Sequence, residues 1–129
     1  MVDAGDDVEL VVVSRFRAEP GTEELATEEL ATEELRAEEL RAGLHAAHAA
    51  LAARPGYVGG HVGRNLDDPD LWLLTTSWAN VGSYRRALSS YDVKVSAVPL
   101  LSRAIDEPSA YESDLLGGDT NVQRPRDLR

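Results

Sequence analysis

The stretch "VELVVVSRFR", residues 8 to 17, decides the fold because it is apolar on both faces of an extended chain. Successive side chains of a strand point to opposite faces, so Leu10 and Phe16 lie on one side while Val11 and Val13 lie on the other. This pattern is typical of an interior strand that is covered on both sides. Either helices flank both faces of the sheet, or helices cover one face and a partner subunit covers the other.

The rest of the chain supplies one long helix and further strands. Leu40, Leu44 and Leu51 form an apolar helical stripe, and Pro55 with Gly56 ends that helix. The patterns beyond it predict strands over 57–65 and 71–78, short helices over 81–90 and 92–105 with a break near Pro99, and a last strand within 108–116. This order predicts an α+β fold of the ferredoxin-like split βαβ type, an antiparallel sheet with helices on one face. The bare second face then favours a sheet-to-sheet homodimer.

The predicted domain spans residues 8–116, after an N-terminal segment (1–7) and before a C-terminal tail (117–129) that we expect to be flexible. The segment "GTEELATEELATEELRAEEL" (21–40) repeats one five-residue phrase and holds eight Glu against one Arg, most of the net charge of −10. A five-residue step turns each Leu by about 140° around a helix, so the repeat forms no continuous apolar stripe. Residues 21–39 are therefore predicted to extend the first helix into solvent.

Composition and motifs exclude several classes of protein. No apolar run is long enough to cross a membrane, and the chain has no cysteine, which fits a cytoplasmic location. The Arg residues are scattered and Lys94 is the single lysine, so nucleic-acid binding is not expected. The three histidines form no metal motif, and "GGHVGRN" lacks both the dinucleotide and the Walker signatures. We expect no metal and no other cofactor.

Three phrases carry a resemblance to a known family: "RPGYVGG" after the first helix, "TTSWAN" at the end of a central strand, and "SYRRALSS" directly behind it. In this order and spacing, residues 8 to 112 resemble the antibiotic biosynthesis monooxygenase domain family. The resemblance implies a homodimeric α+β barrel in which two sheets pack together. Some members oxidise polycyclic aromatic substrates with molecular oxygen and without metal or flavin, whereas others degrade haem.

We therefore expect a pocket for a small-molecule substrate around the end of the central strand. Trp78 matches the family's tryptophan there, and His61 lies in a glycine-rich strand that leaves room for a ligand and could remove a proton. The family's pattern places one face of the first strand in the pocket, and His48 flanks the helical stripe. The candidate catalytic residues are His61 and Trp78, and the candidate substrate-binding residues are Ser14, Phe16, His48 and Tyr84.

Three functions follow from these residues. The first is a cofactor-independent monooxygenase acting on an aromatic or polyketide-like compound, and the second is a non-catalytic dimeric module that binds or senses a small molecule. The third, haem degradation, requires an Asn on the first strand and a His on a later helix. Ser14 occupies the first of these positions, and Ser96 or Ala97 the second, so the axial ligand is missing.

Overall fold

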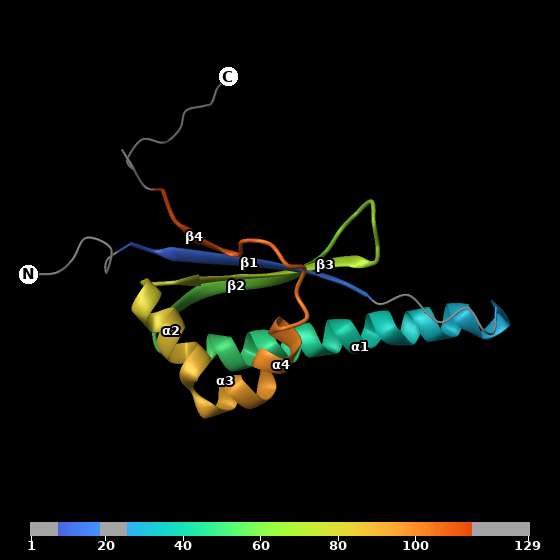
Figure 1. The fold of residues 1–129 in the computed structure, drawn as a ribbon, viewed down its shortest axis with the longest axis horizontal. Helices are drawn as coiled ribbons and strands as arrows, with labels where there is room; N and C mark the ends of the chain where they lie inside the picture. Colours follow the sequence, from blue (N-terminus) through green and yellow to red (C-terminus); the bar gives the residue numbers. More distant parts are fainter. Residues whose placement is uncertain (1–7, 19–25, 115–129) are drawn as a thin grey trace, which may run out of the picture.

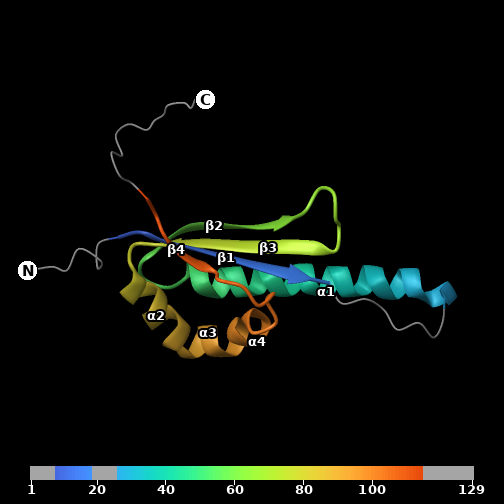
Figure 2. The same cartoon turned by 45° about the horizontal axis from the view of Figure 1, so that its top comes forward.

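The computed structural model describes residues 8–18 and 26–114 and places every helix of these ranges on one face of a single sheet (Figure 1). The elements are β1 (Leu10–Arg17), α1 (Ala26–Ala52), β2 (Tyr57–Arg64), β3 (Leu71–Trp78), α2 (Val81–Ser89), α3 (Tyr91–Ser96), α4 (Val98–Leu101) and β4 (Ala110–Glu112). The view in Figure 2 shows the same two layers, with the helices below the sheet.

The sheet has the strand order β2-β3-β1-β4, and each neighbouring pair is antiparallel. This arrangement confirms the predicted ferredoxin-like α+β fold. The last strand is shorter than the sequence pattern predicts, because only Ala110–Glu112 pair with β1. All three residues of β4 are exposed, so no core packing extends this strand.

Burial alternates along the two central strands and defines two faces of the sheet. The helix-facing side is in the core, whereas the side chains of the outer face are partly exposed or exposed. The buried set on these strands is Leu10, Val12, Phe16, Trp72, Leu74, Thr76 and Trp78. The apolar outer residues, Val11 and Val13 on β1 and Leu73 on β3, are only partly buried by the described part of the chain.

The long helix α1 is held in the core by its second half. Leu40, Leu44 and Leu51 are buried as the stripe predicts, whereas Leu35, within the repeat, is 64% exposed. The first half of α1 extends beyond the sheet in both views (Figures 1 and 2). The start of the repeat (21–25), the N-terminal segment and the C-terminal tail lie outside the described residues.

The ends of the shorter helices follow from local chemistry. The Asn80 side chain accepts a hydrogen bond from the Ser83 amide at 2.8 Å and caps α2. The predicted break near Pro99 occurs at Ala97, so that Pro99 stands in the first turn of α4. The missing amide of a proline has no helical partner to lose at that position.

Gly56 makes the turn from α1 into β2. Its φ of 90° lies in the left-handed region that a glycine adopts without strain. A side chain at this position would also collide with the side chain of Ser83 on α2. Gly56 thus allows the turn to approach α2 closely.

Candidate functional site

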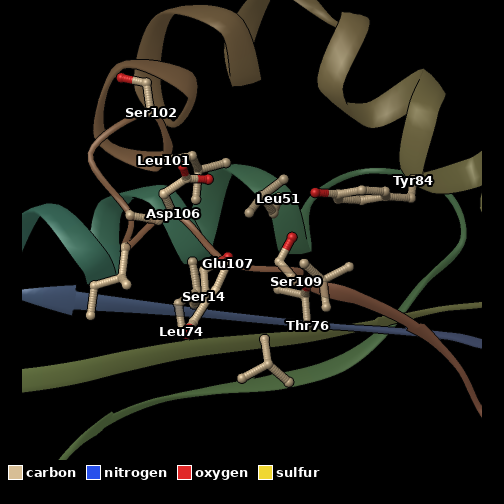
Figure 3. Close-up of a pocket in the computed structure, with 14 residues that line it drawn as sticks. Ser14, Leu51, Leu74, Thr76, Tyr84, Leu101, Ser102, Asp106, Glu107 and Ser109 are labelled. Carbon is tan, nitrogen blue, oxygen red and sulfur yellow. The ribbon is translucent and has the colours of Figure 1, made fainter.

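A cavity of about 350 Å³ lies between the helix-facing side of the sheet and the segment that joins α4 to β4 (Figure 3). Every layer of the fold contributes to its wall, since β1, β3, α1, α2 and α4 all supply side chains. The lining residues are Val12, Val13, Ser14, Leu51, Leu74, Thr76, Tyr84, Leu101, Ser102, Ala104, Ile105, Asp106, Glu107 and Ser109.

The segment from α4 to β4 is attached to β1 at three points. The Ile105 amide donates to the carbonyl of Arg15 at 2.8 Å, and the Val13 amide donates to the carbonyl of Ser109 at 2.7 Å. Between them, the Arg15 guanidinium makes two hydrogen bonds to the Glu107 carboxylate, at 2.7 and 2.8 Å. This paired geometry lowers the pKa of Glu107 below its usual value and holds the outer wall of the cavity in place.

The wall of the cavity combines apolar and polar side chains, and half of its lining residues are polar. Leu51 and Leu74 form apolar parts of the wall, and Figure 3 shows the Tyr84 hydroxyl pointing inward toward Leu51 and Ser109. Asp106 is exposed and lies beside Leu101 at the α4 side. Such a cavity suits a small ligand that has both an apolar body and oxygen atoms able to form hydrogen bonds.

Four rings form a continuous row behind the cavity. The His48 and Tyr57 ring centroids are 5.7 Å apart, those of Tyr57 and Trp78 are 5.5 Å apart, and those of Trp78 and Tyr84 are 5.6 Å apart. The edge-to-face geometry between Tyr57 and Trp78 is a favourable arrangement of two aromatic quadrupoles. The row therefore connects α1, β2, β3 and α2 at the end of the sheet where Trp78 lies.

His48 and Tyr57 are joined by a hydrogen bond of 2.5 Å between Nε2 and the phenol oxygen. Burial lowers the pKa of His48, with smaller contributions from the charges of His45 and His61. Burial likewise raises the pKa of Tyr57. Both shifts favour the uncharged forms, so the pair is a neutral hydrogen bond at neutral pH.

The structure separates five of the six candidate site residues into three groups. Ser14 and Tyr84 line the cavity. Phe16 and Trp78 are 1% and 0% exposed and form the core behind it. His48 belongs to the aromatic row and does not line the cavity.

His61 lies on the opposite face of the sheet from the cavity. Its register partner is Thr75, on the outer side of β3, and the His61 side chain is exposed. A β-bulge between Tyr57 and Gly59 sets this orientation, because the extra residue Val58 reverses the alternation of β2. Unbroken alternation from Tyr57 would have placed His61 on the helix-facing side.

Thr76 and Asp106 line the cavity, and neither was among the sequence candidates. Thr76 stands two residues before Trp78 on β3, so strand alternation was a signal that both share a face. Asp106 follows the last helix in a segment without regular structure, where no pattern in the sequence indicates its direction.

The described residues contain no group of three or more His, Asp or Glu side chains that could hold a metal ion. Among the helices of the same ranges, none combines the length and the hydropathy that a bilayer-spanning segment needs.

Comparison with solved structures shows the same fold in distant proteins. SnoaB, a cofactor-independent oxygenase from Streptomyces nogalater, is 19% identical with a TM-score of 0.62, over 83% of this chain and 94% of that one. A conserved protein from Methanosarcina mazei is 17% identical with a TM-score of 0.60, over 84% and 95% of the two chains. One from Bacteroides thetaiotaomicron is 9% identical with a TM-score of 0.63, over 83% and 99%.

No curated protein matches the sequence. The family model of the antibiotic biosynthesis monooxygenases, however, matches residues 9–96, more than half of the chain, and confirms the resemblance found in the sequence. The protein therefore belongs to the antibiotic biosynthesis monooxygenase family.

Proposed function

We propose that the protein is a cofactor-independent monooxygenase that oxidises an aromatic or polyketide-like small molecule with molecular oxygen. The observation that carries this proposal is the cavity of about 350 Å³, which is lined by both apolar and polar side chains, the Tyr84 phenol among them. Its volume is within the range of small-molecule sites, about 300–1,000 Å³. Family membership and the fold shared with SnoaB support the same reaction class.

A monooxygenase without cofactor needs a substrate that supplies the electrons. An anthrone-type compound fits this need, because its ring methylene becomes a ketone while one atom of the oxygen molecule enters the product and the other leaves as water. The substrate first loses a proton to give an electron-rich enolate or phenolate. The protein then has to hold this anion, accept the proton and keep bulk water from the reacting carbon.

In the proposed reaction, Tyr84 and Ser14 contact the substrate, and Phe16 and Trp78 form the rigid core that supports the cavity. Asp106 accepts the substrate proton and, because it is exposed, passes it to solvent. His48 supports Tyr57 and through it Trp78. His61 is out of reach of a substrate in this cavity, since the sheet lies between them.

Oxygen consumption with a panel of anthrones and quinols tests this function, with product mass spectra showing one oxygen atom from labelled oxygen gas. Asp106→Asn is expected to lower the rate, and His61→Ala is expected to leave it unchanged because His61 lies on the other face. Binding without oxygen uptake across the panel would contradict the proposal.

A non-catalytic binding module is the second candidate, and one observation favours it. No histidine of the described residues lines the cavity, so the side chain that most often moves protons near neutral pH is missing there. This alternative predicts that substrate analogues bind while oxygen is not consumed, and that Trp78→Phe changes only their affinity.

We also propose that the protein acts in the cytoplasm as a homodimer whose outer sheet faces pack together. The outer face carries Val11, Val13 and Leu73, and Tyr111 on β4 pairs with Val11 and is 52% exposed. Sedimentation velocity tests this assembly. Leu73→Glu should yield monomers, whereas Leu66→Glu, at a residue 99% exposed outside the sheet, should leave the dimer intact.

A further inference from the structure

We propose that Thr76 donates the hydrogen bond that stabilises the anionic oxygen of a phenol or enol in the cavity, and that Trp78 acts as its positioning residue. This inference rests on the proposed function, because it names the substrate class of the same cavity. It assigns the binding step to a side chain of β3 that has no charge.

The argument begins with one buried hydrogen bond. The indole Nε1 of Trp78 donates to Thr76 Oγ1 at 2.9 Å. Both residues are removed from solvent, since Thr76 is 2% and Trp78 is 0% exposed. In such surroundings a hydrogen bond is electrostatically stronger than in water, so the bond holds the Oγ1 atom of Thr76 in place and restricts the directions open to its O–H.

The polarity of this bond is set by the chemistry of the two groups. An indole N–H is only a donor, whereas a threonine hydroxyl has one donor and two acceptor positions. Trp78 therefore uses an acceptor position of Thr76 and leaves its O–H free to donate. Within the described part of the chain, no acceptor for this O–H is found.

The O–H of Thr76 can find an acceptor only on the side of the cavity. Thr76 lines the cavity, whereas its neighbours Thr75 and Ser77 lie on the outer face of the sheet. A buried donor without an acceptor is unfavourable, so a ligand oxygen placed beside Thr76 gains a bond that the protein itself does not supply. The site is thus arranged before the ligand arrives, which is the condition for strong electrostatic stabilisation of a developing anion.

A second neutral donor faces the same space. Figure 3 shows the Tyr84 hydroxyl directed into the cavity, and burial raises the pKa of Tyr84, which keeps the phenol protonated. Asp106 lies at the α4 side, and its carboxylate disfavours ligands that arrive as carboxylates or phosphates, whereas the charge of Glu107 is compensated by Arg15. The two hydroxyl groups and the Asp106 carboxylate together select a ligand that arrives as a neutral phenol or enol. The ligand becomes an anion only when its proton moves to Asp106 and then to solvent.

The test uses the hydroxyanthraquinone dye alizarin, whose absorbance changes when its phenol ionises. Alizarin bound to the unaltered protein should show a phenol pKa lowered by about one unit, which is a tenfold preference for the phenolate. Thr76→Val should remove this shift, and Thr76→Ser should keep it because the hydroxyl remains. Trp78→Phe should reduce the shift, since the Thr76 hydroxyl is then free to turn.

Thr75→Val is the matched control, because it changes the adjacent threonine on the other face of the sheet. It should leave the pKa of bound alizarin as in the unaltered protein. An unshifted pKa in the unaltered protein, an equal shift in Thr76→Val, or failure of alizarin to bind would each overturn the inference. If Thr76→Val does not fold, loss of the shift in Thr76→Ser overturns it.

These outcomes are separate from those of the oxygenase test. A shifted pKa without oxygen uptake on any anthrone supports the role of Thr76 and removes the proposed monooxygenase function. Oxygen uptake with an unshifted pKa supports the function and removes the role of Thr76.

Discussion

Tyr57 and His48 are linked by a hydrogen bond of 2.5 Å that joins the first residue of β2 to α1. The bond places the Tyr57 ring against Trp78, the residue that ends β3 and lies at the centre of the core. The pair is close enough to Gly60 that a Cβ atom there would stand 2.9 Å from the phenol oxygen and 3.1 Å from Nε2 of His48. The hydrogen bond between His48 and Tyr57 therefore requires a glycine at position 60.

The stability of the protein is expected to decrease in mild acid because of His48. Its folded pKa is lowered by burial from an unfolded value of about 6.5, so the unfolded chain binds the proton first. His48 therefore makes its full contribution to the free energy of unfolding above that pH, and this contribution is lost as the pH falls below it. Urea unfolding at about pH 7 and about pH 5 measures this loss. The free energy of unfolding should decrease less between the two pH values for His48→Gln than for the unaltered protein. Equal losses in both proteins would contradict this account.

Gly60→Ala should destabilise the fold by about 1–3 kcal/mol, the usual cost of forcing a side chain into a packed site. The added carbon would meet the Thr75 carbonyl oxygen as well as the His48–Tyr57 pair. Gly59→Ala is the control, because a Cβ atom at that residue meets no atom within 4 Å. Thermal unfolding of the two variants compares them directly, and similar melting temperatures would refute the steric argument.

The acidic repeat is expected to contribute little to the core. Leu44 is 0% exposed and Leu35 is 64% exposed on the same helix. Leu44→Ala should cost about 2–5 kcal/mol because it leaves a cavity in the core. Leu35→Ala should change the free energy of unfolding by less than about 0.5 kcal/mol, as exposed substitutions usually do. Chemical denaturation measures both, and a large loss in Leu35→Ala would show that the repeat packs against something.

The ion pair of Arg15 and Glu107 is expected to hold the cavity wall. Glu107→Gln removes one charge of a two-bond contact, so the segment from α4 to β4 should open more often. Hydrogen exchange should become faster at two amides that join this segment to β1. The Val13 amide donates to the carbonyl of Ser109, and the Ile105 amide donates to the carbonyl of Arg15. Asp68→Asn breaks the other β1 ion pair, to Arg17, and should leave these two amides unchanged. Unchanged exchange in Glu107→Gln would mean that the backbone bonds alone hold the wall.

Tyr84→Phe should lower kcat for an accepted anthrone by about 10–100-fold, less than the loss usual for a donor in an oxyanion hole. Removing the hydroxyl leaves the ring packed on Trp78, so the fold is retained. Tyr91→Phe removes a hydroxyl from a tyrosine that is 78% exposed and should leave the rate unchanged. Steady-state oxygen uptake gives both rates. A full rate in Tyr84→Phe would place the substrate away from this hydroxyl.

The sequence by itself determined the kind and the order of the elements. Alternation in β1, the stripe of α1, the Pro55–Gly56 stop and the Asn80 cap are all local signals, and they act on the residues that carry them. The same signals indicated a ferredoxin-like sheet. The resemblance to the family pointed to Ser14, and the position of Tyr84 behind Trp78 pointed to Tyr84; both line the cavity. Family membership followed from phrases within these elements.

Only the tertiary structure decided which side chains face the cavity. One bulged residue, Val58, turns His61 to the outer face, and no periodicity in the sequence marks the position of a bulge. The direction of Asp106 depends on where the segment after α4 attaches to β1, which is a contact between residues far apart in the chain. The hydrogen bond from Trp78 to Thr76 is likewise strong only because the helices bury both residues. A pattern of residues fixes local geometry, whereas register, bulges and long-range contacts determine the chemistry of the site.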